Sequence, residues 1–404
     1  MLYDYRCVIG RVHYVRGSLV KWEIPVGSGN CGFVLVFADF EMGSGNMLKR
    51  AITDKAANSI RILSSEDGAI WDALVDASPT ANRFLRSDCL RMLEQTDSVG
   101  IQFLQLGAFD HAGNLCAGWA LPSERQYGIN TSTYFEFFYA GPILSPDLVG
   151  ESIRVRRARM QVLHDLAQAG AGMLDIISCE GHPGLHDVRG ICYAGWQAQI
   201  RYAHVWDFTN PTEILAQMNR EHRRLIKRGC ESYTFGALGP DHFQTFIALH
   251  KDTLVRRFRW KSASAWDTDL ARRMEWLLAN DVGCLYGARN AAGDLCAAVV
   301  LLYSCQDRTA YLWRSGNIAF AGTKTIVPSL YWQACLYARE RWGTPLCINF
   351  GGSPQMSLSQ FKDYLGARPE PHFRFIYRTS HWRSALWLSN RILRKLNSNQ
   401  LGAG

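Results

Sequence analysis

The sequence predicts an α/β protein of the α+β kind, built from two copies of one domain. Its 404 residues exceed what one hydrophobic core usually organises. A composition of 48% hydrophobic and 20% charged residues supplies enough apolar side chains for two cores. A short motif also recurs: Gly113–Cys116 (GNLC) and Gly293–Cys296 (GDLC) stand 180 positions apart (293 − 113). Together these observations indicate an internal duplication.

Each motif lies between two apolar stretches and predicts a β-hairpin whose turn holds Gly with Asn or Asp. The elements that follow each hairpin match in order. In the first copy a strand, a loop, a helix and a strand follow over 133–140, 141–150, 151–168 and 173–179. In the second copy the same order follows over 309–314, 315–328, 329–342 and 345–350. Generic alternation of strands and helices is the competing explanation.

The second copy is expected to begin with a helix that starts at Thr209–Pro211 and buries Ile214, Leu215, Met218 and Leu225. Residues 1–46 are glycine-rich and fit neither copy, so we expect an extension that the fold does not need, or a mis-called start. The predicted domains are therefore an N-terminal extension (1–57), a first domain (58–205), a second, catalytic domain (206–378), and a basic amphipathic helix with a tail (379–404).

Cysteine placement and hydropathy predict a cytoplasmic protein. The twelve cysteines form no C-x-x-C pair, and several lie inside apolar runs, as buried thiols do in a reducing compartment. No apolar run approaches the ~18 residues that span a bilayer, and the first residues lack a signal-peptide core. Cys179, His182 and His186 come nearest to a metal set, but a turn is the ordinary interpretation, so we predict no metal.

The net charge of +8 is concentrated in a few segments. Arg223, Arg224 and Lys227 share one predicted helix and could meet the phosphates of a tRNA or nucleotide; a solvated helix face is the alternative. The segment 380–397 predicts a basic amphipathic helix. Such a helix either lies on the inner face of an anionic membrane or packs back on its domain.

Strand and helix order after each hairpin is that of the GNAT acyltransferases, whose central strands splay apart. The loop AFAGTKTIVPS lacks their pyrophosphate motif, R/Q-x-x-G-x-G/A, which makes standard coenzyme A binding doubtful. This departure and the duplication resemble the Fem-type (FemABX) aminoacyltransferases, which are tandem GNAT folds with mixed, splayed sheets. The resemblance covers roughly 60–377. Its segments are WDALVDASPTANRF, YAGPI, MNREHRRLIKRG, TLVRRF and, most specific, NFGGS with LSQFKDYLGA. Exosortase-linked and cellulose-linked acetyltransferases share much of this pattern.

The resemblance implies a site at the end of the second copy. There the Lys of the Phe361-Lys362 pair stabilises the oxyanion of acyl transfer, and Phe361 packs under the strand. A surface lysine on a short helix is the alternative. Gly351, Gly352 and Ser353 end a buried strand and would let a substrate approach the backbone; an ordinary strand-to-helix turn is the alternative.

The remaining candidates are expected to bind substrate. Arg256 matches the family arginine that contacts acceptor phosphate, with Arg257 an equal candidate by position. Tyr311 and Trp313 share one face of the splayed strand, where the family places an aromatic against the acceptor; a core role is the alternative.

The sequence thus predicts an acyltransferase that moves an aminoacyl or acyl group onto an amine of a cell-envelope precursor, either peptidoglycan-like or polysaccharide. We expect direct attack, because no Ser or Cys stands beside a His in a triad-like motif. No cofactor is required, and the donor is aminoacyl-tRNA or acetyl- or acyl-CoA. The alternatives are a coenzyme A-dependent N-acetyltransferase acting on a sugar, and a non-catalytic binding protein for tRNA or anionic glycans.

Overall fold

The computed structural model describes residues 59–126, 129–132, 135–258, 264–319, 323–343, 346–353 and 355–379, together with three strands near the N-terminus. Contacts divide the chain into a small unit, Leu2–Lys55, and a large unit that contains Ala56–Gly404. In the small unit the strands β1 (Val12–Val15), β2 (Leu19–Val26) and β3 (Gly29–Val36) form an antiparallel sheet in that order. The predicted dispensability of residues 1–57 and the other domain boundaries stay predictions.

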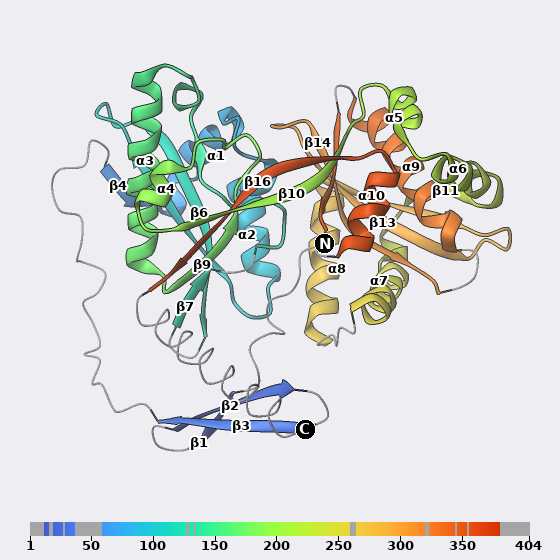
Figure 1. Cartoon of the computed structure of the whole chain (residues 1–404), viewed down its shortest axis with the longest axis horizontal. Helices are drawn as coiled ribbons and strands as arrows, with labels where there is room; N and C mark the ends of the chain where they lie inside the picture. The colour runs from blue at the N-terminus through green and yellow to red at the C-terminus, as the bar shows by residue number, and fades with distance from the viewer. Residues whose placement is uncertain are drawn as a thin grey trace, which may run out of the picture. The chain divides into compact units, whose positions relative to one another are not determined.

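The first copy in the large unit contains both strands and helices (Figure 1). Its strands are β4 (Ser59–Ile62), β5 (Gln102–Phe109), β6 (Leu115–Gln126), β7 (Ile129–Ser132), β8 (Ile143–Leu144), β9 (Ile176–Glu180) and β10 (Gln197–Asp207). Its helices are α1 (Gly68–Ala77), α2 (Ser87–Thr96), α3 (Ile153–Met173) and α4 (Arg189–Tyr193), with short 3-10 turns η3 (Ser65–Asp67), η4 (Arg83–Leu85) and η5 (Pro146–Leu148).

The second copy repeats the plan. Its strands are β11 (Thr234–Leu238), β12 (Gly283–Arg289), β13 (Leu295–Ser304), β14 (Thr309–Asn317), β15 (Cys347–Gly352) and β16 (Arg368–Arg378). Its helices are α5 (Pro211–Gln217), α6 (Arg220–Ser232), α7 (Phe243–Phe258), α8 (Ser264–Ala279), α9 (Thr323–Trp342) and α10 (Met356–Tyr364), with the 3-10 turn η6 (Pro240–His242). The predicted α/β class with two copies and a mixed sheet is confirmed.

The two predicted hairpins are closed by the same turn. In β5–β6 the Asp110 N–H donates to the Asn114 carbonyl, and Gly113 (φ 81°) closes the turn. In β12–β13 the Asn290 N–H donates to the Asp294 carbonyl, and a glycine 180 positions after Gly113 (φ 89°) closes the turn. The acidic and amide residues have changed places, yet each can accept the same backbone hydrogen bonds.

A second repeat relates the end of each copy at an offset of 171 (366 − 195). Gly195 follows α4 and Gly366 follows α10, both with positive φ (87° and 75°). Each glycine N–H donates to the carbonyl three residues earlier, over 3.0 Å and 2.8 Å. The ends of the copies, β9–α4–β10 and β15–α10–β16, are therefore equivalent.

The last strands of the two copies are exchanged. β10 follows the first copy but pairs with β15 of the second, whereas β16 follows the second copy but pairs with β9 of the first. Between these ends β10 and β16 pair with each other from Gln197↔Ile376 to Val205↔Arg368. In Figure 1 they run side by side from one copy to the other. One sheet thus continues through both copies, in the order β11-β12-β13-β14-β15-β10-β16-β9-β7-β6-β5-β4.

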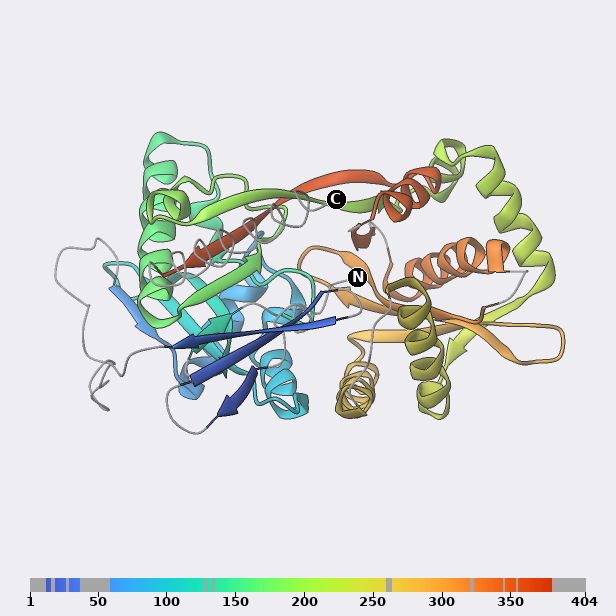
Figure 2. The ribbon, with the colours of Figure 1, turned by 60° about the horizontal axis from the view of Figure 1, so that its bottom comes forward.

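Helices cover both faces of the second copy's sheet, with α7 and α8 on one face and α6 and α9 on the other (Figure 2). Alternate residues of β13 accordingly enter different cores: Val300 and Leu302 join α7 and α8, while Val299 and Leu301 join α6 and α9. The first of these cores also contains the apolar interior of the first copy. The copies consequently share this first core.

Two predicted elements are wrong in detail. The helix expected from residue 209 is two helices, because Met218 is extended and the Asn219 side chain caps a new helix by accepting from the Glu221 N–H. The strand expected over 133–140 is absent among its described residues, 135–140. These residues pack between the copies instead, with Phe137 against Trp313 (ring centroids 5.6 Å apart) and Phe138 against Tyr311 (4.4 Å).

A buried ion network joins the copies. Glu136 accepts from Arg273 over 2.9 Å and from Arg314 over 2.5 Å, and Arg273 also donates to Asp97 over 3.1 Å. These side chains are at most 9% exposed. Because the carboxylates come from the first copy and the guanidinium groups from the second, the network depends on the two copies being together.

Replacing Glu136 by Ala should destabilise the whole large unit by about 3–5 kcal/mol, because buried Arg314 loses its carboxylate and buried Arg273 keeps only Asp97. Chemical denaturation followed by tryptophan fluorescence measures the loss. The matched control is Asp281→Asn, which breaks the exposed pair of Asp281 with Arg341 and should cost under about 1 kcal/mol. Equal effects of the two changes would contradict this role.

Candidate functional site

The predicted site lies where β14 and β15 separate. The two strands pair in parallel only over Thr309↔Cys347, Ala310↔Ile348 and Tyr311↔Asn349, although both strands continue further. Gly351 adopts φ 69°, and its N–H donates to the Asn349 Oδ1 over 2.7 Å. The Asn349 amide also donates to the Tyr139 hydroxyl of the first copy over 3.0 Å. The end of β15 is therefore fixed by its own asparagine and by the first copy.

Lys362 points inward from α10 and is 5% exposed. Its Nζ donates to the carbonyl oxygens of Phe350, Gly351 and Gly352 over 2.9, 2.8 and 2.9 Å. The positive φ of Gly351 turns successive carbonyls toward one point, which is why one ammonium group reaches all three. The alternative of a surface lysine is excluded by this burial, while the catalytic role stays a prediction.

Phe361 is half-buried and packs beside the same site. Its ring lies 6.4 Å from Tyr331 of α9 and 5.9 Å from His222 of α6, measured between centroids. It thus anchors α10, and with it Lys362, against the helices of the second copy.

Burial lowers the pKa of Lys362 from its usual 10.5 to about 7. The three carbonyl oxygens act in the opposite direction, because an ammonium group has three N–H donors and a neutral amine only two. Below this pKa Lys362 is a buried cation whose charge is balanced by backbone dipoles in place of a carboxylate.

The first copy closes the equivalent place without a cation. The residue 171 positions before Lys362 is Ile191, which is fully buried. The free edge of β9 is occupied by the chain itself, since the Ala140 N–H donates to the Glu180 carbonyl over 2.9 Å. Among the described residues of these two strand ends, therefore, it is the second copy that presents edge carbonyls to a lysine side chain.

Tyr311 and Trp313 lie on β14 and are both buried, at 1% and 4% exposure. The Tyr311 hydroxyl donates to Asp307, and the Trp313 indole donates to the Glu136 carbonyl over 3.2 Å. Both rings pack against the first copy in the shared core. Their predicted contact with substrate stays untested, and their core packing is what the structure describes.

Arg256 and Arg257 lie in the last turn of α7, and both are exposed. Arg256 donates to Asp252 over 2.8 Å and to the Asn317 carbonyl at the end of β14. Arg257 lies close enough to Tyr331 to lower the hydroxyl's pKa, although burial raises that pKa overall. Both arginines therefore lie at the rim of the β14 end of the site.

Arg223, Arg224 and Lys227 are all exposed on α6. The Arg223 guanidinium donates to the Leu215 carbonyl over 3.3 Å. They make a basic helix surface, and their predicted contact with nucleic acid stays a prediction.

A group of polar residues at this site was missed by sequence reasoning. His204 on β10 is buried, and its Nδ1 lies 3.4 Å from the Ser353 Oγ. Its Nε2 lies 3.2 Å from the Ser359 Oγ and 3.3 Å from an Asp363 carboxylate oxygen. No triad-like motif in the sequence marks this contact, because the strand exchange brings His204 to Ser353 from 149 residues away. A lone His within the apolar run AHVWDF was the only signal in the sequence.

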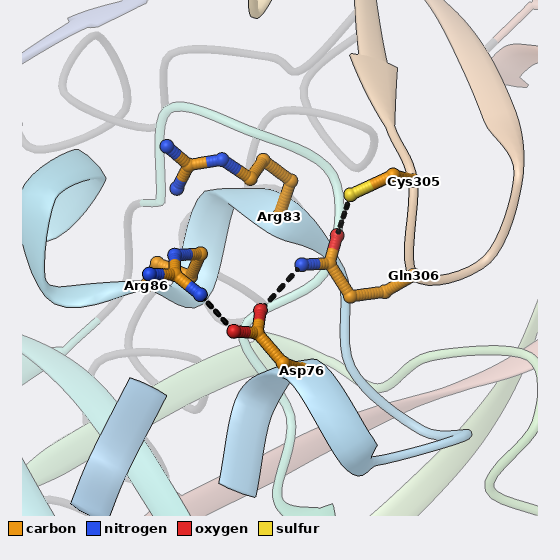
Figure 3. A pocket seen from close by; sticks show the side chains of 5 residues that line it. All are labelled: Asp76, Arg83, Arg86, Cys305 and Gln306. Carbon is orange, nitrogen blue, oxygen red and sulfur yellow. Dashed lines mark hydrogen bonds and ion pairs between the residues drawn. The ribbon is translucent and has the colours of Figure 1, made fainter. Parts of the chain in front are cut away.

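Elsewhere a pocket of about 390 Å³ lies between α1, η4 and the β13–β14 turn (Figure 3). It is lined by Asp76, Arg83, Arg86, Cys305 and Gln306. Arg86 pairs with Asp76, which also accepts from the Gln306 amide over 2.8 Å, and Arg83 pairs with Asp88 over 2.5 Å. The guanidinium charges are thus neutralised, and no predicted site residue lines this pocket.

His182, one of the three residues that came nearest to a metal set in the sequence, has ordinary protein partners in the structure. Its Nδ1 accepts from the Gly184 N–H over 3.0 Å, and its Nε2 lies 3.2 Å from Asp307. Groups of three or more His, Cys, Asp or Glu with metal-binding geometry are absent among the described residues. Within the same residues, every helix is too short or too polar to cross a bilayer.

Comparison with known proteins identifies the fold. FemX has a similar solved structure, with a TM-score of 0.59 and 12% identity over 81% of this chain and 99% of FemX. Lower TM-scores relate the chain to a tandem GNAT protein from the clavulanic acid biosynthesis pathway (0.49; 11% identity; 79% and 97% covered) and to L-PGS from Bacillus licheniformis (0.47; 12%; 78% and 92%). The chain has a FemX-like fold. Neither a protein-family model nor a curated protein sequence matches it.

The stability of the site should depend on pH through Lys362. Between pH 7 and 10.5 the unfolded chain holds a proton that the folded lysine has released, so unfolding takes up a proton and its free energy rises with pH. Below pH 7 both states are protonated and the contribution is constant. In Lys362→Met this rise should be absent, as urea denaturation at a series of pH values measures.

The control is Lys251→Met, which removes the half-exposed pair of Lys251 with Asp267 and should keep the wild-type slope. If wild type and Lys362→Met have the same slope, the three carbonyls hold the ammonium through this pH range.

Proposed function

We propose that the protein is an acyltransferase that moves an aminoacyl or acyl group onto an amine of a cell-envelope precursor. One observation carries the proposal: a buried lysine stands at the separated strands of the second copy alone. The first copy has Ile191 at the equivalent position and closes its strand edge with its own backbone. The fold can therefore be completed without a buried cation, so the cation in the second copy is retained for another reason. The FemX-like fold supports acyl transfer as that reason.

In this mechanism the acceptor amine attacks the acyl carbonyl directly, and negative charge develops on the carbonyl oxygen. Lys362 stabilises that oxygen, which a well-placed donor does by about 3–4 kcal/mol. All three Nζ donors are bonded to backbone carbonyls, so the oxyanion takes the place of one of them. Gly351, Gly352 and Ser353 would border the acyl group, and Arg256 with Arg257 would bind acceptor phosphate at the rim.

The donor is proposed to be an aminoacyl-tRNA, with acetyl-CoA or another acyl-CoA as the alternative, and no further cofactor. Exposed Arg223, Arg224 and Lys227 offer a cationic surface to a donor phosphate backbone. A coenzyme A-dependent N-acetyltransferase of a sugar unit, and a non-catalytic tRNA- or glycan-binding protein, are the competing functions. We further propose that the protein works in the cytoplasm, where a lipid-linked acceptor would bring it to the inner face of the membrane. The predicted membrane-binding segment, 380–397, lies outside the described residues.

A donor screen tests the function. Purified protein is mixed with acetyl-CoA or charged tRNA and with nucleotide-linked or lipid-linked envelope precursors, and a mass increment on the precursor is measured. Lys362→Met should lower kcat by about 10²–10³-fold, as loss of an oxyanion donor does. Lys251→Met should leave kcat near the wild-type value. Unaltered turnover in Lys362→Met would contradict the proposed role of Lys362.

Charge reversal tests the donor. Replacing Arg223, Arg224 and Lys227 with Glu should abolish tRNA binding. If weak binding remains, the slope of log affinity against log salt should be smaller by about 0.7–0.9 for each phosphate contact that is lost. The matched control places Glu at Arg154, Arg156 and Arg157, three exposed arginines of α3 in the first copy. Filter binding at several salt concentrations measures both variants. If both lose binding equally, the effect is one of net charge and the α6 surface is not the donor site.

A further inference from the structure

His204 connects the site to solvent through hydrogen-bonding groups from three segments. Ser353 ends β15, His204 lies on β10, and Asp363 lies on α10 next to Lys362. The Ser353 Oγ lies 3.4 Å from the His204 Nδ1, and the Asp363 carboxylate lies 3.3 Å from the Nε2. Ser353 is half-buried beside the carbonyls that Lys362 binds, whereas the Asp363 side chain is 50% exposed. The row therefore leads from the end of β15 to the surface.

The chemistry of the partners fixes the tautomer of His204. A carboxylate can only accept, so the Nε2 facing Asp363 carries the hydrogen. A neutral imidazole has one N–H, which leaves a lone pair on Nδ1. The Ser353 hydroxyl must then donate to Nδ1. In this arrangement His204 is a base whose free lone pair is directed at a hydroxyl of the site.

The surroundings of His204 keep it neutral. Burial lowers its pKa, the nearby Lys362 lowers it further, and Asp363 raises it by a smaller amount. Of the other packed elements, β16 places Pro369 opposite His204, between Arg368 and Glu370, which pair with each other over 3.7 Å, and β15 contributes the Ser353 hydroxyl. At neutral pH the imidazole is thus free to take a proton.

The first copy again provides an internal comparison. At the offset of 171, His204 corresponds to Phe375 and Ser359 corresponds to Val188, both buried apolar residues. Phe375 packs against Gly181 at the end of β9, as His204 does against the end of β15. Since the fold accepts Phe at this place, a buried histidine is not required for packing.

We infer that Ser353, His204 and Asp363 form a proton-transfer chain that takes the proton from the attacking amine. This rests on the proposed acyl transfer. The amine lone pair forms the new bond to the acyl carbon, and the bond from that carbon to the donor oxygen or sulfur breaks with its electron pair. The amine proton passes to the Ser353 Oγ while the Ser353 proton passes to the His204 Nδ1. The imidazolium then releases its Nε2 proton past Asp363 to water, and the leaving group takes a proton from water. Before the next turnover the ring exchanges its Nδ1 proton for one on Nε2 through water, which restores the starting tautomer.

The first test needs no substrate. In protein labelled with ¹⁵N-histidine, the signals missing from His204→Phe identify His204. We expect the Nε2–H tautomer and a pKa below the ordinary 6.5, lowered further in Asp363→Asn. An Nδ1–H tautomer would overturn the chain, because Ser353 could then not donate to His204.

The second test follows rates against pH, with the donor that the screen selects, acetyl-CoA or glycyl-tRNA. Wild-type kcat should fall at low pH as His204 is protonated. His204→Phe, and His204→Gln as a second variant, should lower kcat by about 10²–10⁴-fold, remove this acid limb and leave KM unchanged. Asp363→Asn should move the acid limb to lower pH. Ser359→Ala, which removes the other contact to Nε2, should stay within about threefold of wild type.

A retained acid limb in folded His204→Phe would overturn the proposed proton-transfer chain. An acyl group found on Ser353 by mass spectrometry, after the protein is mixed with donor alone, would overturn it as well. A wild-type chain that transfers from neither donor contradicts the proposed function itself. In that case the tautomer of His204 still decides whether Ser353, His204 and Asp363 are hydrogen-bonded in the proposed order.

Discussion

The exchange of β10 and β16 is the constraint on which the rest of the molecule depends. Each copy lacks its own last strand and receives that of the other, so neither sheet is complete alone. Hydrogen bonding runs through both copies, and one apolar core lies across them. The buried Glu136 network adds a charged contact that is satisfied only when the copies are together. A rigid relation between the copies follows from these three features.

The exchange also decides which residues meet at the site. His204 belongs in chain order to the first copy, yet β10 carries it beside β15 of the second. The Tyr139 hydroxyl reaches the same strand through Asn349. The site is thus assembled from both copies, although only the second supplies the lysine. The first copy therefore contributes to the second copy's site through its last strand.

The parts of the fold that the sequence predicts are those encoded locally. The GNLC and GDLC turns are short and nearly identical, so their repeat is visible, and the FGGS and FK segments mark the end of the second copy. The 171-residue repeat escapes notice because few identities remain in it, among them Tyr193 with Tyr364 and Gly195 with Gly366. The strand exchange and the partners of His204, 149 and 155 residues away, depend on long-range pairing that no local pattern encodes. The aromatic run at 135–138 has strand propensity, but tertiary packing between the copies overrides it.

Lys362 and His204 are two basic groups close together, and their proximity explains how a proton would leave such a site. Lys362 holds its positive charge among carbonyl oxygens, and this charge disfavours a second one on the adjacent His204. A proton that reaches His204 therefore does not rest there, because the imidazolium is repelled by the ammonium on one side and attracted to Asp363 on the other. Asp363 is half-exposed, so water can take the proton from there. The same ammonium group that would stabilise the oxyanion would thus also drive the proton outward, since both effects arise from one buried charge next to a path to solvent.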